Sequence, residues 1–566
     1  MYVRTTSRTA KDGTVVRYLQ LAHNEWDAAA GRSKPRILFS FGREDQLDRG
    51  AVERLIGALA RLLDPAAGAA LPGVPDDLVF TDSRAFGGTY LLDELWRRLG
   101  IDERIRGLLA GRKLDAARVE RVLFALVASR ALASSSKLAA AEWISSDVHI
   151  DGLPEIGEQA CYRAMDELLK IETVLAEQVY FQVTDLLNLE VDLLFFDTTN
   201  TYFELDDADA ELPRDKDGRL TDDPGQVTGE RGFRSWGKSK DGRDDLPQVV
   251  VGMAVTRDGI PVRVWSWPGG TADSKLIRQV KDDMRAWSLS RIVWVADRGF
   301  SSGDNRRELM RGAGGYIIGE KLRSGSVEVK AALSRQGRYA VVRDNLQVKE
   351  VNIGSDDRFV LCFNPEQAER DAAVRARLVA QLDEAIADTD KLAKTDRARL
   401  EGVLSTKPGL KRFLRVTPGG LLRVDKKKAA AEANLDGKYL LRSSDPNLSP
   451  EDIALGYKQL LEVERGWKDM KSIIDLRPVY HRLEDRIRAH VLLCWLALLL
   501  IRVAENTSGQ TWNRIRAEVQ RLHAVTFTGP AGTFRQTTEP TKTQRDLFTA
   551  LGVDLPKRVQ DVTPAS

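Results

Sequence analysis

The sequence predicts an α/β fold in which a mixed β-sheet carries a polar site along one edge. Two apolar runs, DLLFFD ending at Asp197 and RIVWVAD ending at Asp297, each indicate a buried strand that finishes in an acid. Between them, DLPQVVVGMAVTRDGIPVRVWSWPGG predicts two strands joined at an Asp258-Gly259 turn. Sites at strand ends are typical of α/β architectures, so both acids are candidate site residues. For either acid alone, a turn-forming or helix-capping role is an equally good interpretation.

Length and charge allow several domains but indicate no partner by themselves. A chain of 566 residues is too long for one core, and about two to four domains are expected. Because 85 Lys and Arg residues face 83 Asp and Glu, the net charge is only +2, and any nucleic-acid surface must come from local segregation of charge. Three widely spaced cysteines exclude a Cys-based zinc site and suit a reducing cytoplasm. The apolar run from Val491 to Ile501 is too short to cross a bilayer and predicts a buried helix, so no membrane partner is expected.

Two regions with different hydrophobic patterns precede the first acid-ended strand. Residues 1–84 alternate β-like runs, such as VVRYLQLAH and PRILFSFG, with an Ala- and Leu-rich helix. Residues 85–188 are helical, and the run from Ser134 to Ser136 breaks one helix and can cap the next, with Lys137 just inside it. Such a helix-break-helix could bind DNA, although helices packed as a scaffold are an equally good interpretation.

The stretch GFRSWGKS, from Gly232 to Ser239, matches the phosphate-binding P-loop pattern letter by letter. A P-loop needs a buried strand before the glycines and a helix after them, because the free N–H groups of that helix hold the phosphates. Neither flank is present: the upstream segment is polar, and a glycine and a proline follow in KDGRDDLPQ. We therefore interpret the match as coincidence, in a loop whose Lys238, Lys240 and Arg243 offer positive charge to a DNA backbone.

The helical stretch LGYKQLLEVERGWKDMKS supplies a third acid. Tyr457, Glu464 and Lys471 recur at intervals of seven residues, so they share one face of a continuous helix. A carboxylate between a hydroxyl and an ammonium is suited to meet a metal ion and a phosphate together. For this pattern alone, an ordinary surface helix with charges at heptad spacing is the commoner explanation. Glu462 competes for the role of third acid, but it lies off the shared face by roughly 200°.

Taken in order, these motifs resemble the DDE transposases of bacterial insertion sequences, in the class marked by a Y-x2-R-x3-E-x6-K signature. The resemblance rests on FFDTTN at Asp197, on VADRGF at Asp297 and on the Tyr-x2-Leu-x3-Glu-x6-Lys helix, and it extends over roughly residues 185–505. It includes the loop GKSKDGRDDLPQ, the segment GGTADS and the late helix RIRAHVLLCWLALLL. The chain departs from the signature at Leu460, which stands in place of the Arg, as in a branch where this position is apolar. The phosphate contact proposed for that Arg is therefore not carried over.

The resemblance implies an RNase H-like catalytic core in which three carboxylates hold two Mg²⁺ ions, for which Mn²⁺ can substitute. Asp197, Asp297 and Glu464 would be the catalytic metal ligands, with Asp197 shared by both ions. Two ions about 4 Å apart activate a water or a DNA 3′-OH on one side of a phosphodiester and stabilise the leaving oxygen on the other. The residues expected at the DNA are Tyr457, Lys471, Lys238, Lys240, Arg243, Arg298 and Arg465. For the last two, a plain salt bridge is the better explanation.

The long gap between Asp297 and Glu464 predicts an inserted domain. Its β-like runs, among them GGYIIGEKL, RYAVVRD and GKYLLRS, surround a long polar helix, so a mainly β, mixed α/β insertion is expected. After the core, the helix TWNRIRAEVQRLH is expected to precede a Thr-, Gly- and Pro-rich stretch and a frayed end. The expected parts are an N-terminal β/α region at 1–84, a helical, candidate DNA-end-binding region at 85–188, the core at 189–319 and 446–505, the insertion at 320–445, and a C-terminal helical region and tail at 506–566.

The function implied by the resemblance is that of an insertion-sequence transposase. Such an enzyme cleaves and joins double-stranded DNA at the terminal inverted repeats of its own element and at a target. A homodimer is expected because joining needs two ends in one synapse, and the expected location is the bacterial cytoplasm, at the nucleoid. An RNase H-like nuclease or a domesticated DNA-binding factor would share the fold, and terminal inverted repeats flanking the coding region would argue against both. A P-loop NTPase is the remaining alternative.

The interpretation of GFRSWGKS as a coincidence is testable. A P-loop enzyme would bind ATP or GTP through Lys238 and would lose that binding in Lys238→Ala. We expect equilibrium titration with a fluorescent nucleotide to detect no binding to the unmodified chain. Nucleotide binding that disappears in Lys238→Ala would contradict this interpretation.

Overall fold

The computed structural model describes most of the chain, and it divides into two compact units. The described residues are 2–9, 15–27, 31–63, 79–187, 192–284, 287, 292–312, 314–323, 325–477, 479–529 and 532–564. Unit 1 comprises Met1–Gly87, Glu518–Arg545 and Asp554–Ser566, and unit 2 comprises Gly88–Ala517 and Asp546–Val553. The predicted boundary at 188–189 lies outside the described residues.

Unit 1 contains two antiparallel sheets. The first has the order β1-β2-β3, built from β1 (Tyr2–Thr9), β2 (Val15–Asp27) and β3 (Arg32–Arg43), and it is followed by η1 (Glu44–Gln46) and α1 (Arg49–Leu63). The second has the order β20-β19-β18-β4, built from β4 (Val79–Ala85), β18 (His523–Gly529), β19 (Gly532–Thr537) and β20 (Val559–Pro564). Both ends of the chain therefore contribute strands to unit 1.

The second sheet corrects the prediction of a helical C-terminal region with a frayed end. The helices α18 (Trp512–Val519) and α19 (Lys542–Leu551) are present, but three strands accompany them. The Thr-rich run at β18 pairs with β4, as in Thr526↔Asp82, and β20 pairs with β19. These partners lie far apart in the sequence, so no local pattern indicates them, whereas the Gly- and Pro-rich composition favours loops.

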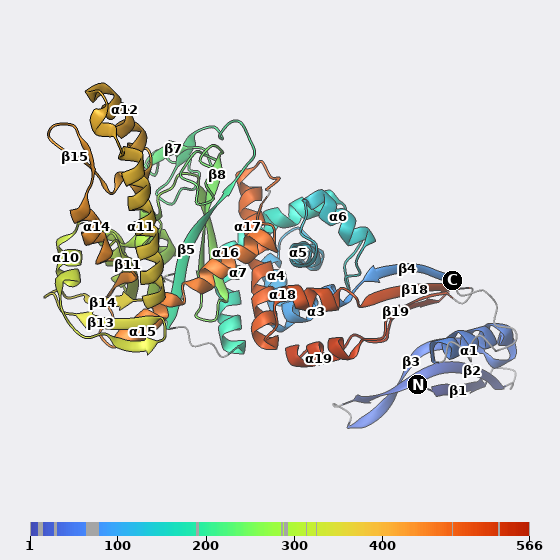
Figure 1. The fold of residues 1–566 in the computed structure, drawn as a ribbon. Coiled ribbons are helices and arrows are strands. Elements are labelled where there is room, and N and C mark those ends of the chain that lie inside the picture. The colour runs from blue at the N-terminus through green and yellow to red at the C-terminus, as the bar shows by residue number, and fades with distance from the viewer. Residues whose placement is uncertain are drawn as a thin grey trace. The chain divides into compact units, whose positions relative to one another are not determined.

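A nine-stranded mixed sheet organises unit 2, in the order β12-β13-β14-β17-β11-β10-β5-β8-β9 (Figure 1). Its central strands are β5 (Leu193–Tyr202), β8 (Gln248–Val255), β9 (Pro261–Pro268), β10 (Val293–Ala296) and β11 (Gly315–Glu320). The strands β5, β10 and β11 run parallel, whereas β8 is antiparallel to both β5 and β9. Every residue of β8, β9 and β10 is buried, as expected for strands covered on both faces. A short separate pair, β6 (Leu212–Arg214) with β7 (Gly229–Arg231), lies in the connection between β5 and β8.

The insertion differs from the separate domain that the sequence predicts, because its strands extend the central sheet. The strand β17 (Lys438–Ser443) pairs with β11 on one side and with β14 (Arg358–Phe363) on the other. Beyond β14 come β13 (Leu346–Val351) and β12 (Ala340–Arg343). Since β11 would otherwise be an edge strand with unpaired backbone groups, pairing with β17 satisfies them.

Helices of the insertion cover these added strands and form a second small core. They are α10 (Val327–Ser334), α11 (Pro365–Ile386), η5 (Thr389–Lys391), α12 (Lys394–Ser405), α13 (Pro408–Lys411) and α14 (Lys426–Ala433). A two-stranded sheet, β15 (Leu414–Val416) with β16 (Leu422–Val424), packs with α11 around Leu382, Phe413 and Leu422. The expected mixed α/β composition is therefore present, with more helix than the β-like runs indicate.

One apolar helix packs against several other elements of unit 2. The helix α17 (Glu484–Ser508) contacts α5 (Ala116–Leu132), α7 (Glu158–Leu186) and β9. Among the described residues, α17 is long and apolar enough to span a membrane, and so are α5 and α6 (Lys137–Ser146) taken together, although they bend by 98° at their break. In α17, 94% of the apolar window is buried inside the protein. The buried helix predicted at Val491–Ile501 is thus the middle of a longer core helix.

The remaining helices of unit 2 surround these elements. They are α3 (Gly87–Arg98), α4 (Ile101–Leu109), η2 (Asp273–Lys275), α8 (Ile277–Asp283), η4 (Arg298–Phe300), α9 (Gly303–Met310), α15 (Pro450–Lys458) and α16 (Leu461–Ser472).

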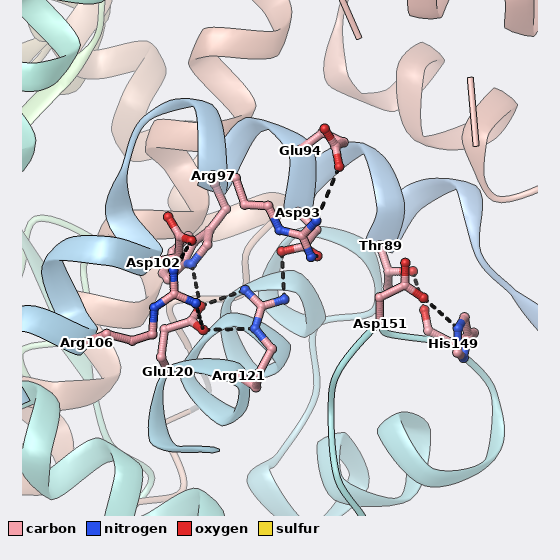
Figure 2. A network of polar contacts seen from close by, with 11 residues as sticks. Thr89, Asp93, Glu94, Arg97, Asp102, Arg106, Glu120, Arg121, His149 and Asp151 are labelled. Carbon is pink, nitrogen blue, oxygen red and sulfur yellow. Dashed lines mark hydrogen bonds and ion pairs between the residues drawn. The ribbon is translucent and has the colours of Figure 1, made fainter. Parts of the chain in front are cut away.

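A buried ion network joins α3, α4 and α5 (Figure 2). The Arg121 guanidinium donates to Glu120 at 2.6 Å and to Asp93 at 2.8 Å, and Arg97 also reaches Asp93 at 2.6 Å. Glu120 is fully buried and accepts a further bond from the Trp96 indole at 2.8 Å. Burial raises the pKa of Asp93 to about 6, although both arginines act to lower it. The network therefore depends on Arg121, which is the cation shared by both buried carboxylates.

Removing Arg121 is expected to destabilise unit 2 strongly. In Arg121→Met, Glu120 and Asp93 stay buried without their main cation, which should cost about 3–5 kcal/mol of unfolding free energy. The side chain of Arg97 is 46% exposed, so Arg97→Met should cost less than about 1 kcal/mol. Chemical denaturation of the two variants measures the difference. Equal losses in both would show that the buried pair contributes no more than a surface pair.

Candidate active site

Parallel pairing of β5 with β10 brings two of the predicted acids together. The register aligns Phe196 with Ala296, so Asp197 and Asp297 each follow a matched pair at the same end of neighbouring strands. Asp197 belongs to β5 and is only 22% exposed, whereas Asp297 comes directly after β10 and is exposed. The strand-end geometry predicted from the two apolar runs is therefore present.

Glu464 approaches the same pair from α16, which packs against β5 and β8. The buried face of α16 consists of Val463, Gly466, Trp467 and Met470. Gly466 permits this close approach, because a side chain there would run into Met253 of β8. Burial raises the pKa of Glu464, and the negative charges of Asp197 and Asp297 raise it further. The three carboxylates thus converge closely enough to repel one another.

Glu462, the competitor for the third position, lies elsewhere. Its carboxylate oxygen is next to Gly259, in the turn between β8 and β9, where an added Cβ would be 2.9 Å away. Its ion partner is Arg465, at 3.9 Å. The geometry therefore favours Glu464 over Glu462, as the heptad spacing does.

The Lys240 ammonium lies against the converging acids. Its Nζ contacts Asp197 Oδ1 at 3.4 Å and Asp273 Oδ2 at 3.7 Å, and it donates to the Thr198 carbonyl and hydroxyl at 2.6 Å each. The Thr198 hydroxyl in turn donates to Asp273 at 2.8 Å. Burial raises the pKa of Asp197, and Lys240 opposes that shift. The lysine that directly follows the P-loop-like stretch is therefore a direct neighbour of the candidate site.

Asp273 is a site residue that the sequence reasoning missed. It begins η2, within the segment GGTADS. The signal available was its place three residues after a Pro-Gly-Gly turn that ends a buried strand, in a segment that the family resemblance includes. A fourth carboxylate therefore borders the predicted three.

Tyr457 supports Asp297 from α15. Its hydroxyl donates to Asp297 Oδ1 at 3.1 Å, and its ring stacks on Tyr439 with centroids 6.0 Å apart. Burial and the Asp297 charge raise the pKa of this tyrosine, so it stays a hydrogen-bond donor at neutral pH. Gly319 of β11 makes room for the hydroxyl, because a Cβ at Gly319 would overlap it.

The prediction that one continuous helix carries Tyr457, Glu464 and Lys471 is wrong. Tyr457 lies on α15, whereas Glu464 and Lys471 lie on α16. The helix α15 ends at Lys458, and α16 begins at Leu461. Between them the hydrogen bonds shorten to three-residue steps, from Leu460 N to the Tyr457 carbonyl and from Glu462 N to the Gln459 carbonyl. Leu460 is 9% exposed, so the burial of an apolar residue accompanies the break.

Lys471 connects α16 to the loop that holds Lys240. Its ammonium contacts Asp241 Oδ1 at 3.0 Å, and Arg477 reaches the same carboxylate at 2.7 Å. Arg477 also lies 4.8 Å above the Tyr202 ring of β5. Because Asp241 directly follows Lys240, these contacts fix the loop beside the acids.

The other predicted DNA contacts fall into two groups. Arg243 pairs with Asp245 at 2.9 Å and lies above Tyr202, and Arg465 pairs with Glu505 at 2.9 Å, which agrees with a salt bridge for Arg465. Lys238 and Arg298 are exposed and have no hydrogen bond or ion pair within the part of the chain that the structure describes, so Arg298 lacks its expected salt bridge. These two cations are available to an external anion.

The P-loop alternative fails on geometry. No helix follows Lys238 and Ser239 before β8, in a stretch that is fully described. Gly237 instead packs against the backbone of Gly270, and Gly232 packs against the Asp209 carbonyl. The glycines therefore permit close backbone packing rather than a phosphate cradle at a helix N-terminus.

The chemistry of the donors fits a divalent cation. Carboxylate oxygens are the ligands that Mg²⁺ takes from proteins, and an ammonium already lies against Asp197. As the side chains stand, no three His, Cys, Asp or Glu residues among those described are grouped closely enough to hold a metal ion.

Comparison with known proteins finds two matching family models. The model described as the IS1634 family transposase, N-terminal domain, matches residues 3–69. The model described as the transposase DDE domain matches residues 214–500, a range that includes Asp297 and Glu464 and begins after Asp197. No curated protein matches the chain significantly.

One solved structure shows a distant similarity. It is the cryo-EM structure of a piggyBac transposase synaptic complex with hairpin DNA, which is 11% identical in sequence. The similarity covers 77% of this chain and 78% of that chain, with a TM-score of 0.33. Since a TM-score this low supports no inference, the family assignment rests on the two family models.

The contact between Gly319 and Tyr457 gives a test of the site geometry. Gly319→Ala should displace the stacked Tyr457 ring and lower the unfolding free energy by about 1–3 kcal/mol, as overpacking does. In a Tyr457→Leu background the same change should be nearly neutral, so a double-mutant cycle isolates the contact. The control is Gly402→Ala in α12, where an added Cβ meets nothing within 4 Å and a small stabilisation is expected. An equal loss from Gly319→Ala in both backgrounds would contradict the assigned contact.

Proposed function

This chain belongs to the DDE transposases of bacterial insertion sequences, and we propose that Asp197, Asp297 and Glu464 form the site at which it cleaves and joins DNA. The observation that carries the assignment is the placement of Asp197 and Asp297 at matched ends of β5 and β10, with Glu464 of α16 close enough that their charges add to the burial that raises its pKa. Like charges held together in this way favour a bound cation.

The strand order supports an RNase H-like core. The five strands in the order β9-β8-β5-β10-β11 combine an antiparallel meander of β5, β8 and β9 with two parallel strands, β10 and β11. We propose that these strands and α16 are the catalytic core, and that β12–β14 and β17 belong to the insertion that extends it.

DDE transposases depend on divalent metal, and we propose two Mg²⁺ ions, replaceable by Mn²⁺, held by Asp197, Asp297 and Glu464. When bound, such ions would activate the attacking oxygen and stabilise the leaving oxygen of the phosphodiester. Asp197 is the least exposed of the three, and we propose that it is the ligand shared by both ions. Tyr457 would orient Asp297 through its hydrogen bond.

The chain's own cations have distinct proposed roles at the DNA. Lys238 and Arg298 are exposed and unpaired among the described residues, so they would bind backbone phosphates directly. Lys471 would act by holding Asp241, and with it the Lys240 loop, against α16. Arg243 and Arg465 would remain in their ion pairs, with a smaller effect on DNA binding.

The substrate we propose is double-stranded DNA, at the terminal inverted repeats of the element and at a target. Joining two ends requires them in one complex, so we propose a homodimer in the synapse. The protein would act in the bacterial cytoplasm, at the nucleoid, where this DNA is found.

Single isosteric substitutions test the three acids. Asp197→Asn, Asp297→Asn and Glu464→Gln should each reduce Mg²⁺-dependent cleavage of an element-end duplex to background, because each removes a charged ligand. Binding of the same duplex, measured by fluorescence anisotropy in EDTA, should be retained. Glu462→Gln is the matched control and should cleave at nearly the unmodified rate, since Glu462 faces the β8–β9 turn. Loss of cleavage in Glu462→Gln together with full activity in Glu464→Gln would reverse the assignment of the third acid.

A further inference from the structure

The break between α5 and α6 buries two cations that the catalytic assignment does not use. Arg130, near the end of α5, is 2% exposed, and Lys137, the first residue of α6, is 4% exposed. The three serines between the helices, Ser134–Ser136, are half-buried and lie nearer the surface. Ser136 caps α6 by accepting a hydrogen bond from Ala139 N at 3.1 Å.

Within the part of the chain that the structure describes, neither cation forms an ion pair with a carboxylate. One Arg130 nitrogen donates weakly to the main-chain carbonyls of Ile474 and Asp475, both at 3.4 Å, while its Nε and Nη2 atoms have no acceptor. Lys137 has no side-chain hydrogen bond or ion pair to any residue that the structure describes. Burying an unpaired charge costs several kcal/mol, so a buried pair of like charges is expected to have an anionic partner.

The surrounding groups do not neutralise this charge. The charge of Asp475 acts on Arg130, but its carboxylate accepts from the Ser134 hydroxyl at 2.5 Å. His481 and His490 pack with ring centroids 5.7 Å apart, and burial together with Lys137 and Arg130 lowers the pKa of His481 to about 4. His490 is buried, and its Nδ1 also has no partner. Burial and Arg130 lower the pKa of Lys137 itself to about 7.

We propose that the break between α5 and α6 binds a phosphate group, held by Arg130, Lys137, the Ser136 hydroxyl and the N-terminal amides of α6. Each donor suits that ligand: a guanidinium and an ammonium provide charge, and the helix N-terminus adds free N–H groups and a positive dipole end. The half-buried serines lie nearer the surface than the two cations, so a group arriving from solvent would meet the site on their side. The phosphate is either a phosphodiester of a DNA backbone or a free phosphate ion, and the proposal does not depend on the catalytic assignment.

Thermal unfolding with and without phosphate directly tests whether the α5–α6 break binds phosphate. Inorganic phosphate should raise the thermal unfolding midpoint of the full-length chain by a few degrees beyond chloride at matched ionic strength. Lys137→Met should raise the midpoint without phosphate, because an unpaired buried charge is removed, and should abolish the response to phosphate. The matched control is Lys281→Met: this lysine is also shielded, but it donates to the Leu309 carbonyl at 3.3 Å, so the phosphate response should remain.

Duplex binding at constant salt identifies the source of the phosphate. If the phosphate comes from DNA, Lys137→Met should weaken duplex binding at least about tenfold. It should also reduce the slope of log K against log[salt] by about one. If it is a free ion, Lys137→Met should lose only the response to inorganic phosphate. The proposal is overturned if phosphate stabilises the unmodified chain no more than chloride does and Lys137→Met binds DNA normally. The comparison of phosphate with chloride needs no variant, so it stands even where Lys137→Met fails to fold.

Discussion

Parallel pairing between β5 and β10 is the contact on which the candidate site depends. Its register places Asp197 and Asp297 at one end of adjacent strands, about one strand spacing apart. Two carboxylates at that spacing repel, so the surrounding structure must supply donors and cations. Lys240 and Tyr457 supply them, and α16, which lies close to β8 at Gly466, adds a third acid. If the two strands shifted register by one residue, the two acids would no longer lie side by side and these contacts could not all form.

The loop containing GFRSWGKS shows how position in the fold decides the role of a motif. Its glycines pack against neighbouring backbone, and Lys240 reaches the carboxylates. Asp241, the next residue, is held by Lys471 and Arg477, so the loop is tied both to α16 and to the segment that follows it. A phosphate-binding pattern in the sequence thus becomes part of a carboxylate site, because tertiary contacts replace the strand and the helix that a P-loop needs.

Unit 2 contains several buried cations, and they differ in whether a carboxylate pairs with them. Arg121 has two carboxylates, and Arg502 of α17 pairs with Asp469 of α16 and with Glu505. Arg130 and Lys137 have none among the described residues, although they lie on helices of the same packed bundle. Since burying an unpaired charge is costly, the unpaired cations stand out as the place where we propose that a ligand from outside binds.

The sequence alone determined the acid-ended strands and the buried helix at Val491–Ile501, because each depends on local periodicity, and it predicted the third acid from a motif with fixed spacing. The tertiary structure alone decided the rest. Pairing of β17 with β11 merges the insertion with the central sheet, and pairing of β18 with β4 makes strands of a Thr-rich segment expected to be irregular. The sequence also did not predict the helix break at Leu460 or the place of Asp273 beside Thr198, because both depend on neighbours distant in the chain. Long-range strand pairing and the burial of charge leave no periodic trace in the sequence, whereas helical and strand periodicity does.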